Sequence, residues 1–232
     1  MLDAIKKSEP LSEHSPTYQP PPDEGLDIRY LDDDLLVVDK PAGLLSVPGR
    51  GPGKEDCLSA RVQARYPEAL PVHRLDLGTS GLLVLARSPD MHRALNKLFE
   101  TRRVEKRYVA LVAGRMEAGE RVVDLPLIAD WPNRPRQMVD HAIGKPSRTR
   151  LRAVGYDPAL DATRVDLFPE TGRSHQLRVH LQAIGHPILG DELYAPPEVF
   201  VRAPRLLLHA AFLAFFHPST ATELRVESGA PF

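Results

Sequence analysis

The sequence has one cysteine, Cys57, among its 232 residues. An internal disulfide is therefore excluded, and so are zinc sites built from several thiolates. The longest apolar run, residues 206–216, is interrupted by His209 and is too short to cross a bilayer. The first seven residues, MLDAIKK, lack the apolar core of a secretion signal. We therefore expect a cytoplasmic protein without a membrane segment.

Loops that hold nucleotide phosphates are also missing. The sequence contains no Gly-x-x-x-x-Gly-Lys-Ser/Thr segment and no Gly-x-Gly-x-x-Gly segment after an apolar strand. The Gly-x-Ser-x-Gly elbow of serine hydrolases is absent as well. His175 and His180 are five residues apart on a predicted helix, so they point to different faces and are poor ligands for one metal ion. We expect neither a cofactor nor a metal.

The chain has no excess of either charge, since its formal net charge is −1. The acidic residues gather in residues 1–34, so the remainder carries a moderate positive excess. Within that remainder the basic residues form two clusters: Arg102, Arg103, Lys106 and Arg107, and then Arg134, Arg136, Lys145, Arg148, Arg150 and Arg152. Clustered bases are typical of a surface that binds a polyanion. On charge alone, the two clusters could also belong to an ordinary solvated surface.

The order of predicted elements indicates the fold class. Residues 1–25 are acidic and rich in proline, so we expect a disordered tail, followed by one catalytic domain over residues 26–232. Apolar spacing predicts helices over 56–66, from Pro89 onward and over 175–184, and strands within 26–38, 82–86, 106–112, 149–156, 163–168, 206–216 and 222–226. Strands joined mainly by turns favour an α+β fold with a mixed, mainly antiparallel sheet.

Residues 72–81, VHRLDLGTSG, place an acid between an apolar segment and a tight turn. Asp76 could cap that turn with its side chain, which is ordinary turn chemistry. It could also be a catalytic acid. Two further candidates stand far away, Tyr108 on a predicted strand and Arg178 on a predicted helix. An arginine beside a carboxylate is usually a structural ion pair, but in a cleft it keeps the acid ionised and nucleophilic.

Several sequence blocks follow one another in an order typical of a known enzyme family. They are Lys40 to Leu44 (KPAGL), His73 to Asp76 (HRLD) with Thr79 to Gly81 (TSG), Lys106 to Ala110 (KRYVA), and Thr171 to His180 (TGRSHQLRVH), followed by Gly185 to Asp191 and Leu206 to Ala210. These blocks resemble the RluA family of RNA pseudouridine synthases, over about residues 26–232. Residues 45–50 and 130–135 are similar to the short founding branch of that family.

The resemblance implies a pseudouridine synthase fold with a central catalytic cleft and no S4 RNA-binding domain. It also implies that a uridine of structured RNA is isomerised to pseudouridine without a cofactor. Asp76 would be the catalytic carboxylate and nucleophile, whether it attacks ribose C1′, adds to uracil or assists a glycal route. Arg178 would pair with Asp76 and orient it, and Tyr108 would pack on the uracil and take a proton.

The resemblance further implies how RNA is held. Arg74, in the block that begins with His73, would fill the space left by a flipped base. The expected RNA contacts are His73, Arg102, Arg103, Lys106, Arg107, Trp131, Arg134 and Arg136. The similarity to the short branch implies two targets, the tRNA anticodon stem-loop and a 23S rRNA hairpin. We expect the protein to act as a monomer.

Two other functions compete with this interpretation. A non-catalytic RNA-binding or RNA-folding protein could use the same scaffold, although the complete set of Asp76, Tyr108 and Arg178 argues against it. A glycoside hydrolase normally needs two neighbouring carboxylates, and Asp76 has no obvious partner acid in the sequence.

Overall fold

The computed structural model describes residues 18–232. Residues 18–25, which the sequence assigned to a disordered tail, lie against the folded body. The Tyr18 hydroxyl donates to the Asp56 carbonyl oxygen at 2.9 Å, and the Arg61 guanidinium donates to the Pro21 carbonyl oxygen at 2.6 Å. These two hydrogen bonds hold part of the tail against the body, and the composition of the tail does not reveal them. The remaining tail residues, 1–17, lie outside the described part of the chain.

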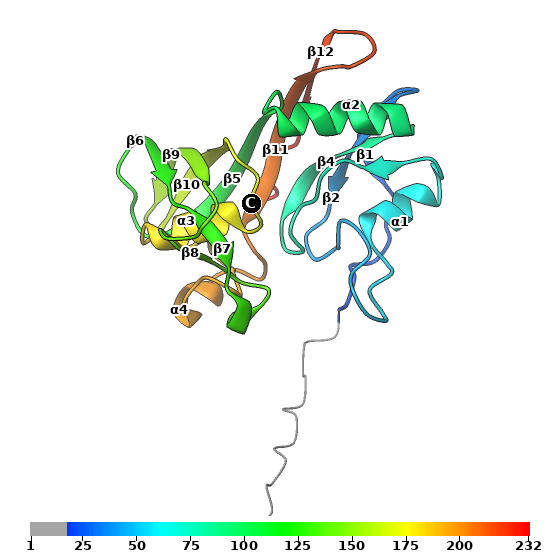
Figure 1. Ribbon diagram of the computed structural model, residues 1–232. Helices are drawn as coiled ribbons and strands as arrows, with labels where there is room; N and C mark the ends of the chain where they lie inside the picture. Colours follow the sequence, from blue (N-terminus) through cyan, green and yellow to red (C-terminus); the bar gives the residue numbers. More distant parts are fainter. Residues whose placement is uncertain (1–17) are drawn as a thin grey trace, which may run out of the picture.

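A ten-stranded sheet runs through the molecule (Figure 1). Its main path follows the order β1-β2-β4-β11-β5-β10-β9-β6, with β3 paired to β4 and β12 paired to β11. Its strands are β1 Asp27–Leu31, β2 Leu35–Lys40, β3 Leu70–Pro71, β4 Ser80–Ala86, β5 Glu105–Ala113, β6 Gly119–Asp124, β9 Arg148–Asp157, β10 Ala162–Pro169, β11 Leu208–Phe216 and β12 Glu223–Glu227. Within residues 18–232 the pairs of this sheet are antiparallel except β4 with β11. The mixed, mainly antiparallel sheet of the sequence prediction is confirmed.

The helices are short and divide between the two halves of the sheet. They are α1 Leu58–Gln63, α2 Pro89–Glu100, α3 Gln176–Ala183 and α4 Pro197–Phe200, with a 3-10 turn η1 at Trp131–Asn133 and a small second sheet of β7 Leu127–Ala129 and β8 Gln137–Val139. In Figure 1, α1 and α2 accompany β1 to β4, whereas α3 and the small sheet accompany β9 and β10. No helix within the described residues is long and apolar enough to span a membrane.

The apolar run of β4 is buried on both faces because each face has its own core. Leu82 and Val84 pack with Leu95 of α2, whereas Leu83 and Leu85 pack with Leu58 of α1. Alternate side chains of a strand point to opposite faces, so a strand covered on both sides reads as one continuous apolar segment. A third core lies beneath α3 in the other half of the sheet.

The sequence also predicted how α2 begins. The Ser88 hydroxyl accepts the Met91 backbone N–H at 3.1 Å, and Pro89 occupies the first turn. This N-cap satisfies a backbone donor that has no partner within the helix. The strands β6 to β8 and the helix α4 were not predicted, because short segments carry too little periodicity.

The one parallel contact of the large sheet depends on a glycine. Gly81 has a φ of +111°, and a Cβ placed there would lie 2.3 Å from the Ala210 carbonyl oxygen. Only a residue without a side chain permits that approach and that backbone angle. The close contact between Gly81 and Ala210 determines where the loop of residues 72–79 ends and β4 begins.

Candidate active site

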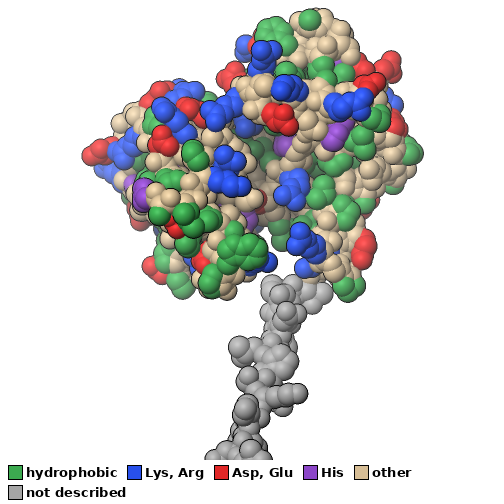
Figure 2. Space-filling model, viewed as in Figure 1, with side chains coloured by type: hydrophobic (Ala, Val, Ile, Leu, Met, Phe, Trp, Pro, Cys, Tyr) green, Lys and Arg blue, Asp and Glu red, His purple; other side chains and the backbone are tan. Residues whose placement is uncertain are grey.

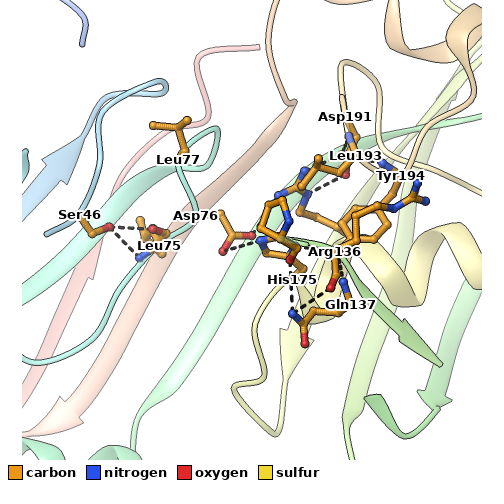
Figure 3. A network of polar contacts seen from close by, with 12 residues as sticks. Ser46, Leu75, Asp76, Leu77, Arg136, Gln137, His175, Asp191, Leu193 and Tyr194 are labelled. Carbon is orange, nitrogen blue, oxygen red and sulfur yellow. Dashed lines mark hydrogen bonds and ion pairs between the residues drawn. The ribbon is translucent and has the colours of Figure 1, made fainter. Parts of the chain in front are cut away.

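The loop of residues 72–79 connects β3 to β4 and is held from beneath by the segment that follows β2. The Ser46 hydroxyl donates to the Leu75 carbonyl oxygen at 2.8 Å and accepts the Leu75 N–H at 3.0 Å (Figure 3). The Gly43 N–H donates to the Leu77 carbonyl oxygen at 2.9 Å. Both neighbours of Asp76 are therefore tied to one rigid segment.

Lys40 adds a charged anchor to the same loop. Its side chain is fully buried, and Nζ donates to the carbonyl oxygens of Leu44 at 2.6 Å, Pro41 at 2.9 Å and Leu77 at 3.2 Å. Burial lowers the pKa of Lys40 to about 7, and the nearby Asp76 opposes that shift. The ammonium group thus joins the segment after β2 to the loop that carries Asp76.

Replacing Ser46 by alanine is expected to loosen this loop. The variant leaves both backbone groups of the buried Leu75 without their partner, which costs about 1–3 kcal/mol of unfolding free energy. We expect urea denaturation to show that loss, and we expect the activity that the family resemblance implies to slow several-fold. Ser219→Ala, at an exposed position, serves as the control. A Ser46→Ala protein as stable and as active as the wild type would contradict the anchoring role.

Asp76 stands in a turn that the backbone closes by itself, since the Thr79 N–H donates to the Asp76 carbonyl oxygen at 3.1 Å. The side chain is therefore not needed as a turn cap. Its carboxylate instead faces α3, with Oδ2 3.5 Å from Arg178 Nη1 and Oδ1 3.9 Å from His175 Nε2 (Figure 3). About 27% of the side chain is exposed, so the carboxylate remains open to a substrate.

Arg178 is held in place by a second acid. Its Nε and Nη2 donate to the two carboxylate oxygens of Asp191 at 2.8 and 2.6 Å, and both side chains are buried. Burial lowers the pKa of Arg178, but Asp191 and Asp76 outweigh it and raise the pKa above its ordinary value. The guanidinium is thus a permanent cation whose third nitrogen, Nη1, faces Asp76.

Tyr108 reaches the same place from β5. Its side chain packs against the cores of both halves of the sheet. Burial, followed by the negative charge of Asp76, raises the pKa of Tyr108, so its hydroxyl stays protonated at neutral pH. Aromatic ring, carboxylate and guanidinium therefore meet although they come from β5, a loop and α3.

These three side chains line a pocket of about 120 Å³. A cavity of about 150 Å³ holds a benzene ring, so the volume suits one planar ring. Figure 2 shows the molecule hollowed between its two halves, with Lys and Arg side chains near the rim. The other charged or polar lining residues are Arg74, Thr79, Lys106, Thr171, Arg173, His175 and Gln176. Among the residues named as lining, Asp76 is the only acid, so the described pocket offers no second carboxylate for glycoside hydrolysis.

Of the residues predicted to contact RNA, two line the pocket and two are exposed beyond the end of α2. Arg74 is exposed and lines the pocket, and Lys106 lines it from β5. Burial, followed by Arg102, lowers the pKa of Lys106. Arg102 and Arg103 are exposed after the end of α2. Arg102 is close enough to Lys106 to affect its pKa, and we refer to Arg74, Arg102, Arg103 and Lys106 together as the basic rim.

Two of the residues predicted to contact RNA do not line the pocket in this structure. His73 Nε2 accepts the Val84 backbone N–H at 3.1 Å, and its ring stacks on Phe99 with centroids 4.7 Å apart. That ring holds the loop against β4 and α2 and does not face the pocket. Arg107 follows Lys106 on β5, so it points to the opposite face of the sheet, where it lies 3.6 Å from Asp166.

The second basic cluster has an aromatic partner. The Arg134 guanidinium lies 3.1 Å from the centroid of the Trp131 ring, and 66% of Trp131 is exposed. Arg136 lies instead over the Tyr194 ring, 5.4 Å from its centroid. The first pair presents a flat surface to solvent, whereas Arg136 covers a side chain that contacts the pocket residue His175.

Sequence reasoning missed the residues that support the pocket. Lys40, Ser46 and Asp191 stood inside blocks that carried the family resemblance, and Tyr194 follows one of these blocks by three residues. No pattern within the chain paired them with Asp76, Arg178 or His175. No group of three or more His, Cys, Asp or Glu side chains within residues 18–232 is arranged to hold a metal ion.

Comparisons with known proteins identify the family. Residues 34–183 match the RNA pseudouridylate synthase family. The chain is 50% identical over 215 residues to a dual-specificity RNA pseudouridine synthase RluA of Escherichia coli K12, covering 93% of this chain and 98% of that protein. An RluA protein of Vibrio vulnificus is 50% identical over 206 residues, 88% of this chain and 82% of its own length.

Solved structures agree with the sequence relatives. The structure of human RNA pseudouridylate synthase domain containing 1 matches with a TM-score of 0.77 and 30% identity, covering 92% of this chain and 87% of that one. Human RNA pseudouridylate synthase domain containing 4 matches with a TM-score of 0.70 and 26% identity, over 88% of each chain. The chain belongs to the RluA family of RNA pseudouridine synthases, and it is an enzyme that isomerises uridine to pseudouridine in RNA.

Proposed function

We propose that Asp76 is the catalytic carboxylate, with Tyr108 and Arg178 as its partners in the reaction. The observation that carries this proposal is their convergence on one pocket from three separate parts of the chain. The side chains lie 3.5 Å apart at Asp76 Oδ2 and Arg178 Nη1, and Tyr108 forms the apolar wall beside them. This arrangement offers an anion, its counter-charge and a flat surface for a base.

The isomerisation needs these groups in different ways. The bond from uracil N1 to ribose C1′ breaks, uracil turns, and a bond from C5 to C1′ forms. The proton leaves C5 and a proton is added at N1, so no other reactant is consumed. Asp76 acts on the sugar or the base at its open carboxylate, and Arg178 orients that carboxylate. Tyr108 holds the uracil ring by packing while it turns, and its protonated phenol takes up a proton only as it gives up its own.

The target uridine must leave its stack before it can enter the pocket, which costs a few kcal/mol. An RNA loop lowers that cost because its bases are already partly splayed. We propose that the exposed Arg74 fills the vacated space, since it stands at the pocket two residues before Asp76. Arg102, Arg103 and Lys106 would contact phosphates along the basic rim, and such contacts position RNA without reading its sequence.

The exposed pair of Trp131 and Arg134 is the proposed stacking surface for an unpaired base. An indole already stacked on a guanidinium keeps one face of its ring available, and a base stacked on an aromatic ring gains about 1–3 kcal/mol. Arg136 is not part of this stacking surface, because its guanidinium covers the Tyr194 ring. His73 and Arg107 are not included.

The proposed substrates are the tRNA anticodon stem-loop and a 23S rRNA hairpin. This step rests on the similarity to proteins described as dual-specificity RNA pseudouridine synthases. Mapping pseudouridines in tRNA and 23S rRNA from bacteria with and without this protein tests it. We expect one loss in each RNA class. A loss in only one class would contradict dual specificity, and unchanged maps in both classes would contradict both targets.

A further inference from the structure

His175 stands at the pocket in a backbone conformation that few residues adopt. It precedes α3 with φ of 54° and ψ of 15°, in the left-handed region. A non-glycine residue held there costs on the order of 1–3 kcal/mol and persists only when its surroundings fix it. Here the ring lies between two partners, Tyr194 on one side and Asp76 on the other (Figure 3).

Tyr194 determines which imidazole nitrogen carries the proton. Its oxygen accepts the Gln137 backbone N–H at 2.8 Å and lies 2.7 Å from His175 Nδ1. Burial raises the pKa of Tyr194 to about 12, so the phenol keeps its proton. With its oxygen already accepting from Gln137, the phenol donates its proton to Nδ1. The neutral imidazole then carries its own proton on Nε2.

That Nε2 proton is on the side of the ring that faces Asp76. His175 Nε2 lies 3.9 Å from Asp76 Oδ1, and Arg178 Nη1 lies 3.5 Å from Oδ2. Neither distance is that of a short hydrogen bond. Contacts of catalytic groups are often long in an unliganded enzyme and tighten when the substrate binds.

The charges around the ring favour the neutral form. Burial lowers the pKa of His175, Asp76 opposes that effect, and Arg178 adds to it. Asp191 also faces the ring, but both of its oxygens are occupied by Arg178. Arg136, the residue before β8, lies over the Tyr194 ring on the side of the small sheet. The neutral His175 imidazole and the charged Arg178 guanidinium therefore face different oxygens of the Asp76 carboxylate.

We propose that His175 and Tyr194 form a second positioning arm for Asp76. Tyr194 holds the imidazole with its proton on Nε2, and Nε2–H donates to Asp76 Oδ1 while Arg178 holds Oδ2 in the complex with RNA. Orienting a carboxylate from both oxygens restricts its rotation, so the attacking lone pair keeps one direction. This inference rests on the proposed role of Asp76.

The test uses two amide side chains that differ in length by one methylene group. Asparagine tolerates the left-handed conformation, so His175→Asn keeps the backbone but cannot bring a donor to Asp76. Glutamine in His175→Gln can place its Nε2 near the position of the imidazole Nε2. Each full-length variant is measured by single-turnover pseudouridine formation on an unmodified anticodon stem-loop or 23S hairpin, whichever RNA the wild type modifies. RNA binding and urea denaturation are measured in parallel.

We expect His175→Asn to slow the single-turnover step on the order of 10- to 100-fold, because a misplacement of about 1 Å at a catalytic group can cost about 100-fold. RNA affinity should stay within about twofold of the wild type, and His175→Gln should recover much of the rate. Tyr194→Phe should also slow the step, because the His175 imidazole is then no longer held with its proton on Nε2. A His175→Asn protein with the wild-type rate, or a His175→Gln protein no faster than His175→Asn, would overturn the proposal.

An Asp76→Asn protein included in the same series separates the two levels of inference. If Asp76→Asn is inactive and His175→Asn is fully active, only the positioning arm is wrong. If Asp76→Asn is itself active, the proposed role of Asp76 fails first.

Discussion

Asp76→Asn is expected to abolish pseudouridine formation while RNA binding remains. Loss of a catalytic group that acts with its partners as a unit lowers turnover by about 10⁴-fold or more. Asparagine has nearly the same shape, and the backbone hydrogen bond from Thr79 closes the turn without the side chain. The fold and the basic rim should therefore be unchanged. Single-turnover conversion of a uridine-labelled RNA measures the rate, and a filter-binding titration measures the affinity.

The matched control for this change is Asp33→Asn. Asp33 is fully exposed in the turn between β1 and β2, and its one recorded ion pair is a 3.9 Å contact with Arg87. It should retain the wild-type rate. An Asp76→Asn protein that still converts uridine at more than about one hundredth of the wild-type rate would show that another group performs the chemistry.

Asp191→Asn is expected to have the largest effect on stability. The substitution leaves the buried Arg178 guanidinium without its bidentate partner, and a buried charge that loses its partner costs about 3–5 kcal/mol. The asparagine oxygen can still accept the backbone N–H groups of Leu193 and Tyr194, so the effect falls on the pairing with Arg178. Urea denaturation measures the free energy of unfolding.

The same variant should also slow pseudouridine formation, because Arg178 is no longer held at a fixed distance from Asp76. Glu117→Gln provides the comparison, since it breaks an exposed ion pair with Arg121 on the surface. Exposed pairs of this kind contribute about 0–1 kcal/mol. If Asp191→Asn were as stable as Glu117→Gln, the buried pair would not be what positions Arg178.

Local patterns predicted much of the framework. The continuous apolar run of β4, the N-cap at Ser88 and the end of α3 at Gly185 all follow from residues within a few positions of one another. Local patterns did not show which of two adjacent residues faces the pocket. Lys106 lines the pocket, but Arg107 points to the other face of β5 and meets Asp166. A cluster of bases in a strand cannot form one surface, because alternate side chains diverge.

His73 shows a related limit. It was grouped with Arg74 because the two are adjacent in one motif, yet its imidazole accepts a backbone N–H of β4 and stacks on Phe99. Burial, followed by the charge of Lys106, lowers the pKa of His73 to about 3, in keeping with a neutral ring used for support. Only the neighbouring strand and helix reveal that role.

The sequence by itself determined most of the longer elements, the family and the candidates Asp76, Tyr108 and Arg178, because periodicity and motifs are properties of neighbouring residues. Only the tertiary structure decided which groups support them. Arg178 meets Asp76 across 102 positions of sequence, and Ser46 meets Leu75 across 29. Both contacts depend on the closure of the chain into one sheet, which brings Arg178 and Asp76 together from different halves and Ser46 and Leu75 together within one half. No local pattern encodes that closure, so the pairing of Asp191 with Arg178 and of Tyr194 with His175 emerged from the fold.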